Sequence, residues 1–129
     1  MECVNSMDEK NKQKAKVLIV DDEEDLTELI KLALKNDYEI TSCFDGKEAL
    51  YLLESVKPDI VITDIYMPIL GGLDLINEIR RISRIPIIVI SGGRLTKKIP
   101  YLESKGVSSI IEKPFSVREL KTHIEAALA

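Results

Sequence analysis

Short runs of β-branched residues alternate with longer stretches of helical periodicity along most of the chain, and few folds satisfy that pattern. Five runs are predicted to be strands, namely residues 16–20, 38–42, 60–63, 86–90 and 108–111. Several are apolar at consecutive positions, which is typical of strands that helices cover on both faces. Strands that alternate with helices favour right-handed crossovers. We therefore expect an α/β fold, a three-layer sandwich around a doubly wound, five-stranded parallel sheet.

The stretches between these runs are predicted to be helices. The first carries its apolar residues at the spacing of one helix face: Leu26, Leu29, Ile30, Ala33 and Leu34. Asp45 and Ser116 are each followed by a glutamate three residues later, which resembles a capping box, so we expect a helix after each. Pro100 is tolerated only in the first turn of a helix. We expect a mobile loop over residues 92–99 and a short helix that starts near Pro100.

Length and composition fit one domain. The chain has 129 residues, of which 45% are hydrophobic and 31% charged, enough to bury a core without disulfides or a structural metal. Residues 1–15 are polar and lack periodicity, so we expect a disordered leader followed by a folded domain over residues 16–129. Cys3 and Cys43 form neither a disulfide framework nor a metal-binding spacing, which suits a reducing compartment.

Charge and hydropathy exclude two classes of partner. Twenty-two acidic residues against 18 basic ones give a net charge of -4, which argues against direct binding of nucleic acid. No apolar run approaches the ~18 residues of a membrane span, and the start of the chain is too polar for a signal peptide. We expect a cytoplasmic protein with no membrane partner.

Polar side chains follow four of the predicted strands, at the edge where doubly wound sheets bind ligands. They are Asp21 and Asp22 after the first strand, Asp64 after the third, Ser91 after the fourth and Lys113 after the fifth. If the strands follow the flavodoxin-like order 2-1-3-4-5, the first and third are neighbours and three carboxylates converge. Ionised together, they would repel by several kcal/mol unless a cation intervened. A site made only of oxygen ligands suits Mg²⁺ or Mn²⁺. With a lysine and a hydroxyl added, the site can position a phosphoryl group and stabilise its charge during transfer.

Each of these residues alone has an ordinary structural explanation. The acidic run after the first strand could simply stabilise a helix N-terminus. Asp64 and Ser91 could serve turns, and Lys113 could be a solvated side chain. Their combination favours the functional interpretation. The acid pair, the single acid, the hydroxyl and the lysine each fall at the end of a different predicted strand.

Together these segments resemble the receiver domain of bacterial two-component response regulators. The matching pieces are VLIVDDEEDL, DGKEAL, PDIVITDIYMPILGGLDL, PIIVISG and IIEKPFS, and the resemblance covers residues 16–129. It implies that Asp64 is the phosphoacceptor, a carboxylate nucleophile that forms an acyl phosphate. It also implies that Asp22, Asp64 and the backbone carbonyl of Tyr66 ligate Mg²⁺ directly, while Asp21 acts mainly through coordinated water. Lys113 would pair with the phosphoryl oxygens and Ser91 would hydrogen-bond one of them.

The resemblance further implies how such a chain works. The phosphoryl donor would be a phosphohistidine on a sensor histidine kinase or phosphotransfer protein, or a small molecule such as acetyl phosphate. The domain would catalyse only its own phosphorylation and dephosphorylation, and would signal through contacts with a downstream protein. Because the last predicted helix reaches Ala129, we expect a stand-alone receiver similar to the chemotaxis type. Three alternatives stay open: a pseudo-receiver that is never phosphorylated, a fragment of a larger regulator or hybrid kinase, and an aspartate-nucleophile hydrolase.

Three positions depart from the family pattern. Ile110 stands where many relatives carry a switch aromatic, so an aromatic switch at that position is not expected. The hydroxyl after the fourth strand is Ser91 in place of the commoner threonine. The loop over residues 92–99 replaces an ordinary helix start. We therefore predict that phosphorylation rearranges this loop with little change at Ile110.

Overall fold

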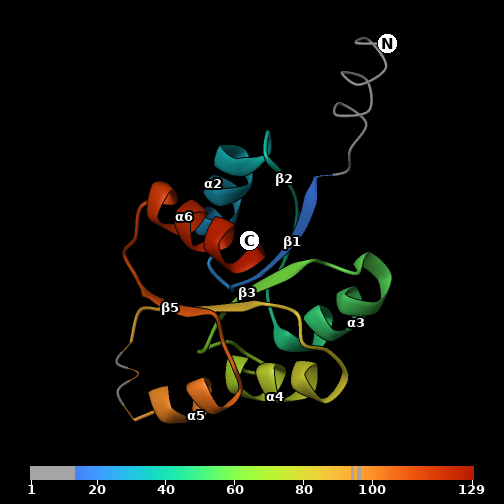
Figure 1. Cartoon of the computed structure of the whole chain (residues 1–129), viewed down its shortest axis with the longest axis vertical. Helices are drawn as coiled ribbons and strands as arrows, with labels where there is room; N and C mark the ends of the chain where they lie inside the picture. Colours follow the sequence, from blue (N-terminus) through green and yellow to red (C-terminus); the bar gives the residue numbers. More distant parts are fainter. Residues whose placement is uncertain (1–13, 94, 96) are drawn as a thin grey trace.

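The computed structural model describes residues 14–93, 95 and 97–129 (Figure 1). Its elements are β1 (Ala15–Val20), α2 (Glu24–Leu34), β2 (Tyr38–Cys43), α3 (Gly46–Val56), β3 (Ile60–Asp64), α4 (Gly72–Ile82), β4 (Ile87–Ser91), α5 (Ile99–Ser104), β5 (Ser109–Glu112) and α6 (Val117–Leu128). Apart from Lys14 and Ala15, the predicted leader over residues 1–15 lies outside the described residues. Ala15 already belongs to β1, so this strand begins one residue earlier than predicted.

The five strands form one parallel sheet in the order β2-β1-β3-β4-β5. The predicted flavodoxin-like α/β fold is therefore confirmed. Strands β1 and β3 are neighbours, with Val20 paired to Thr63 near their carboxyl ends. The residues that follow these two strands consequently emerge side by side, where the strand order reverses.

Helices cover both faces of the sheet and bury two separate apolar cores. In Figure 1, α2 and α6 lie on one face while α3, α4 and α5 lie on the other. Alternate residues of β1 point to opposite faces: Val17 and Ile19 pack in the core under α2 and α6, whereas Leu18 and Val20 pack in the other core. Every residue of β3 and β4 is buried. Such burial explains the consecutive apolar residues of these strands.

The predicted helix starts are confirmed. The Asp45 Oδ1 atom accepts a hydrogen bond from the Glu48 backbone N–H at 2.8 Å. The Ser116 Oγ atom does the same for the Glu119 N–H at 3.0 Å. Each side chain satisfies a backbone donor that the first helical turn leaves unpaired. Helix α5 is short and carries its proline in the first turn, as expected.

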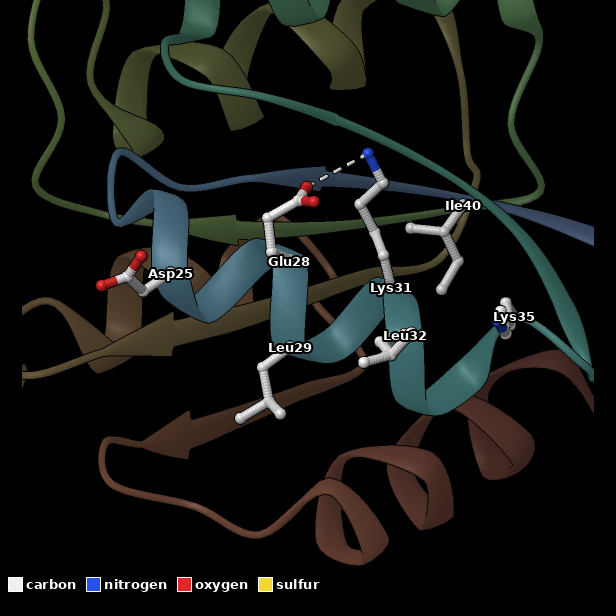
Figure 2. Close-up of a pocket in the computed structure, with 7 residues that line it drawn as sticks. All are labelled: Asp25, Glu28, Leu29, Lys31, Leu32, Lys35 and Ile40. Atoms are coloured by element: carbon white, nitrogen blue, oxygen red, sulfur yellow. Dashed lines mark ion pairs between the residues drawn. The ribbon is translucent and has the colours of Figure 1, made fainter.

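The predicted apolar face of α2 is wrong at two positions. Leu29 is 55% exposed, and Ala33 is also exposed. Helix α2 packs on the sheet through a narrower stripe that includes Ile30 and Leu34. Leu29 instead lines a groove of about 560 Å³, shown in Figure 2, with other residues of α2, the residue that follows α2 and one residue of β2: Asp25, Glu28, Lys31, Leu32, Lys35 and Ile40. Periodicity locates a helix face but does not say how much of it a neighbour covers.

No helix in the described part of the chain is long and apolar enough to cross a membrane.

Candidate functional site

Three carboxylates meet where β1 and β3 end. Asp21 follows β1 and is fully buried, Asp22 is exposed, and Asp64 is the last residue of β3 and 6% exposed. One carboxylate oxygen from each residue lies within 4.8 Å of the others. The convergence expected from the strand order is thus present in the structure.

Backbone N–H groups fix the orientation of Asp64. Its Oδ1 atom accepts hydrogen bonds from the N–H of Ile65 at 2.6 Å and of Tyr66 at 3.2 Å. The loop then returns to the sheet through Gly72, whose N–H donates to the Ile65 carbonyl at 2.9 Å. A Cβ at Gly72 would lie 2.2 Å from the Asp64 carbonyl oxygen. The close approach of α4 to β3 therefore requires a glycine at this position.

Lys113 provides the positive charge of the site. Its backbone N–H donates to the Ser91 carbonyl at 2.8 Å, which extends the pairing of β5 with β4. Its ammonium lies 2.9 Å from Oδ2 of Asp64 and 2.9 Å from Oδ2 of Asp21, and it also pairs with Glu23. Burial alone would lower the pKa of Lys113, but its contacts with the carboxylates of Glu23, Asp21 and Asp64 raise it above its ordinary value. The ammonium is therefore charged throughout the neutral pH range.

Asp21 is the most deeply buried acid of the cluster. Burial raises the pKa of its carboxyl group, while the Lys113 ammonium and the Glu23 N–H act in the opposite direction. Its Oδ1 atom accepts the Glu23 N–H at 2.9 Å. Its Oδ2 atom is in an ion pair with the Lys113 ammonium at 2.9 Å and accepts no other contact from a hydrogen-bond donor within the described residues. A carboxylate oxygen carries two lone pairs, so this oxygen can also accept a hydrogen bond from a water molecule.

The donor set of this cluster fits a divalent cation. It consists of carboxylate oxygens, with no histidine or cysteine among the clustered residues. Hard cations such as Mg²⁺ and Mn²⁺ prefer such oxygens and retain water molecules. Asp21 keeps a lone pair on Oδ2 that can accept a hydrogen bond from such a water. The residues present therefore fit the magnesium ion that the sequence resemblance implies.

Ser91 and Tyr66 flank the acids. Ser91, the last residue of β4, is buried, and its Oγ atom accepts the Gly93 N–H at 3.1 Å. Tyr66 is 50% exposed. The Lys98 ammonium donates to its hydroxyl at 2.5 Å and lies 4.3 Å from its ring centroid. The Tyr66 ring also lies against Gly93, where an added Cβ would come within 3.1 Å of it. The ring thus contacts both Gly93 and Lys98.

Glu23 is the site residue that sequence reasoning missed. The acidic run after β1 predicts a metal site at Asp21 and Asp22 or a helix N-terminus, yet the Glu23 carboxylate contacts Lys113 directly. Its position two residues after Asp21 is a weak signal, because only the direction of its side chain decides whether it joins the cluster. Glu23 and Lys113 also line a hollow of about 400 Å³ beside the acids, together with Leu26, Gly92, Pro114 and Phe115.

Comparisons with known proteins agree with this geometry. Residues 17–125 match the family described as the response regulator receiver domain. The probable transcriptional regulator ycf27 of Guillardia theta is 41% identical over 117 residues, which are 89% of this chain and 46% of that protein. The sensor histidine kinase TmoS of Ectopseudomonas mendocina is 37% identical over 112 residues, which are 84% of this chain and 12% of that protein. This chain therefore spans about half, or less, of the length of these curated relatives.

A solved structure shows the same likeness in three dimensions. The chemotaxis response regulator CheY4 of Vibrio cholerae matches this chain with a TM-score of 0.82 at 27% identity. The match covers 90% of this chain and 100% of that chain.

Proposed function

Because this chain belongs to the response regulator receiver domains of two-component systems, we propose that Asp64 accepts a phosphoryl group and that the phosphorylated domain signals through protein contacts. The observation that carries the proposal is the position of Asp64. Its carboxylate lies between two other acids and the Lys113 ammonium, where a phosphoryl group would meet both a cation site and a fixed positive charge.

The chemistry is an in-line transfer to a carboxylate. An Asp64 oxygen attacks phosphorus, a new O–P bond forms, and the bond from phosphorus to the donor breaks. The donor's electron pair leaves with its histidine nitrogen or, for acetyl phosphate, with the acetate oxygen. The two backbone N–H groups on Oδ1 hold the Asp64 carboxylate in one orientation before the reaction begins.

Three residues would hold the metal ion. Asp22, Asp64 and the backbone carbonyl of Tyr66 are the proposed direct Mg²⁺ ligands, and Asp21 would hold a coordinated water molecule. Bound Mg²⁺, or Mn²⁺ in its place, supplies positive charge next to the oxygens of the transferred group. Asp22 suits direct contact because it is exposed and forms no ion pair within the described residues that would have to break.

Lys113 and Ser91 would recognise the phosphoryl group itself. The Lys113 ammonium would pair with a phosphoryl oxygen, since the proposed acyl phosphate forms on the carboxylate it already contacts. The Ser91 hydroxyl would donate to a second oxygen. In the present structure that hydroxyl oxygen accepts the Gly93 N–H, so recruitment of Ser91 would change the segment before α5.

The proposed donor is a phosphohistidine of a sensor histidine kinase or phosphotransfer protein. The receiver is proposed to act as a single-domain regulator, similar to CheY4, whose whole chain the match covers. A receiver within a longer regulator or hybrid kinase is the second candidate, which the lengths of ycf27 and TmoS favour. The size of the endogenous protein on an immunoblot distinguishes the two.

Intact-mass spectrometry tests phosphorylation directly. Wild-type protein with acetyl phosphate and Mg²⁺ is expected to gain the mass of one phosphoryl group, and Asp64→Asn is expected to gain none. Asp74→Asn is the matched control, because Asp74 is an exposed aspartate in the first turn of α4. A wild-type protein that gains no mass would favour the pseudo-receiver. Rapid turnover of many phosphomonoesters would favour the hydrolase.

A further inference from the structure

We propose that Glu23 is a positioning residue that holds the Lys113 ammonium in the unphosphorylated protein and releases it when a phosphoryl group arrives on Asp64. The proposal rests on the function proposed above. Its basis is the direct contact between the Glu23 carboxylate and the Lys113 ammonium. This contact adds a third acid to an ammonium that Asp21 and Asp64 already neutralise.

Of the three acids, Glu23 is the one that can leave. The side chains of Asp21 and Asp64 are 0% and 8% exposed, and a backbone N–H holds one oxygen of each. The Glu23 side chain is 59% exposed, and Lys113 is its only side-chain partner within the described residues. The adjacent hollow of about 400 Å³ gives its carboxylate room to turn away.

The charges in the site decide the direction of the effect. A phosphoryl group on Asp64 brings further negative charge towards the same ammonium. Glu23 would then compete with the phosphoryl oxygens for Lys113 and would also repel them. Loss of the Glu23 charge should therefore strengthen the binding of a phosphoryl mimic. Since the Glu23 side chain is 59% exposed, water screens its charge. The gain should therefore be about three- to tenfold, and salt should reduce it.

A structural role in the helix is separable from this one. Glu23 occupies the N-cap position of α2, but its side chain makes no capping hydrogen bond. The Glu23 groups that support the helix start are in the backbone, where its carbonyl accepts the Thr27 N–H at 3.1 Å. Glu23→Gln keeps this backbone and the side-chain length and removes only the charge. Its urea denaturation midpoint without Mg²⁺ should therefore stay close to that of the wild type.

The test compares wild type, Glu23→Gln and the control Glu24→Gln. Glu24 is exposed, is the next residue along the chain and forms no ion pair within the described residues. The dissociation constant for beryllofluoride with saturating Mg²⁺ would be measured by NMR titration at low and at high salt. We expect Glu23→Gln to bind about three- to tenfold more tightly at low salt, with a smaller gain at high salt. Glu24→Gln should bind like the wild type.

The possible results separate the two proposals. Equal or weaker binding by Glu23→Gln, with normal binding by the wild type, would overturn the role of Glu23 alone. An equal gain in Glu24→Gln would also overturn it, because the effect would then come from net charge. If the wild-type protein failed to bind beryllofluoride, both this role and the phosphoacceptor function would be wrong.

Discussion

Asp64 and Lys113 are 49 positions apart in the sequence, yet their Oδ2 and Nζ atoms lie 2.9 Å apart. The parallel sheet produces this contact because β3, β4 and β5 end at the same edge. The same edge carries Asp21 and Asp22 after β1. One ammonium thus faces a group of carboxylates, and the following predictions depend on that imbalance of charge.

Removal of the ammonium should destabilise the metal-free protein. Lys113→Met leaves buried Asp21 and Asp64 without their cation. We expect this to lower the free energy of unfolding by about 2–3 kcal/mol, near the lower limit for breaking a buried ion pair, because water reaches the site. Adding Asp21→Asn to this variant should restore part of the loss. Urea denaturation at neutral pH without Mg²⁺ measures both effects. Lys121→Met is the control, since the Lys121–Asp37 pair is exposed; an equal loss in the control would contradict the account.

Substitution of Gly72 should disturb the acceptor through the backbone. In Gly72→Ala the new Cβ would meet the Asp64 carbonyl at 2.2 Å and the Ile65 Cα at 2.7 Å. We expect a loss of about 2 kcal/mol of stability, larger than the gain from better helix propensity, together with slower labelling by acetyl phosphate. Gly92→Ala is the control, because the nearest atom to its Cβ would lie 3.8 Å away. Wild-type stability of Gly72→Ala by urea denaturation would show that α4 can move away freely.

The sheet and the convergence of Asp21, Asp22 and Asp64 are predictable from the sequence, because strand order alone carries their backbones to one edge. The role of Glu23 is not, because its contact with Lys113 depends on the rotamers of two long side chains. The exposure of Leu29 is not predictable either, since the spacing of apolar residues does not show how wide a stripe the sheet covers. What depends on topology was predictable from the pattern, and what depends on side-chain direction was not.

Cys43 should make stability decline at alkaline pH. Burial, with smaller contributions from Glu48 and Asp45, raises the pKa of its thiol to about 12, whereas an unfolded thiol has a pKa of about 8.5. The unfolded chain therefore loses its thiol proton first, so this contribution to stability is complete below pH about 8.5 and is lost as the pH rises towards 12.

The corresponding measurement compares two proteins. In a Cys3→Ser background, the Cys43 thiol should account for a loss of about 2 kcal/mol between pH 7 and pH 10 in urea denaturation. Cys43→Ala in the same background should be less stable at pH 7 but should lack this part of the decline. Parallel pH profiles for the two proteins would rule out the raised pKa.

The contact between Tyr66 and Lys98 links the acceptor loop to the start of α5. The Lys98 N–H donates to the Leu95 carbonyl at 2.7 Å, so movement of Tyr66 should alter this turn. We expect beryllofluoride with Mg²⁺ to change amide hydrogen exchange at Lys98 and Ile99. Exchange at Ile110 should stay nearly unchanged, because Ile110 packs against the core under α3, α4 and α5. Unchanged protection across residues 92–99 would contradict this prediction.

A magnesium titration followed by amide NMR tests most directly whether the acids form one metal site. In the wild type, Mg²⁺ should bind saturably and shift the amide signals of Asp22, Ile65 and Tyr66 first. At a Mg²⁺ concentration ten times the dissociation constant, it should raise the free energy of unfolding by about 1.4 kcal/mol. Asp22→Asn should weaken binding at least about tenfold without lowering metal-free stability, because Asp22 is exposed. Identical Mg²⁺ responses in the two proteins, or no saturable binding by the wild type, would contradict the account.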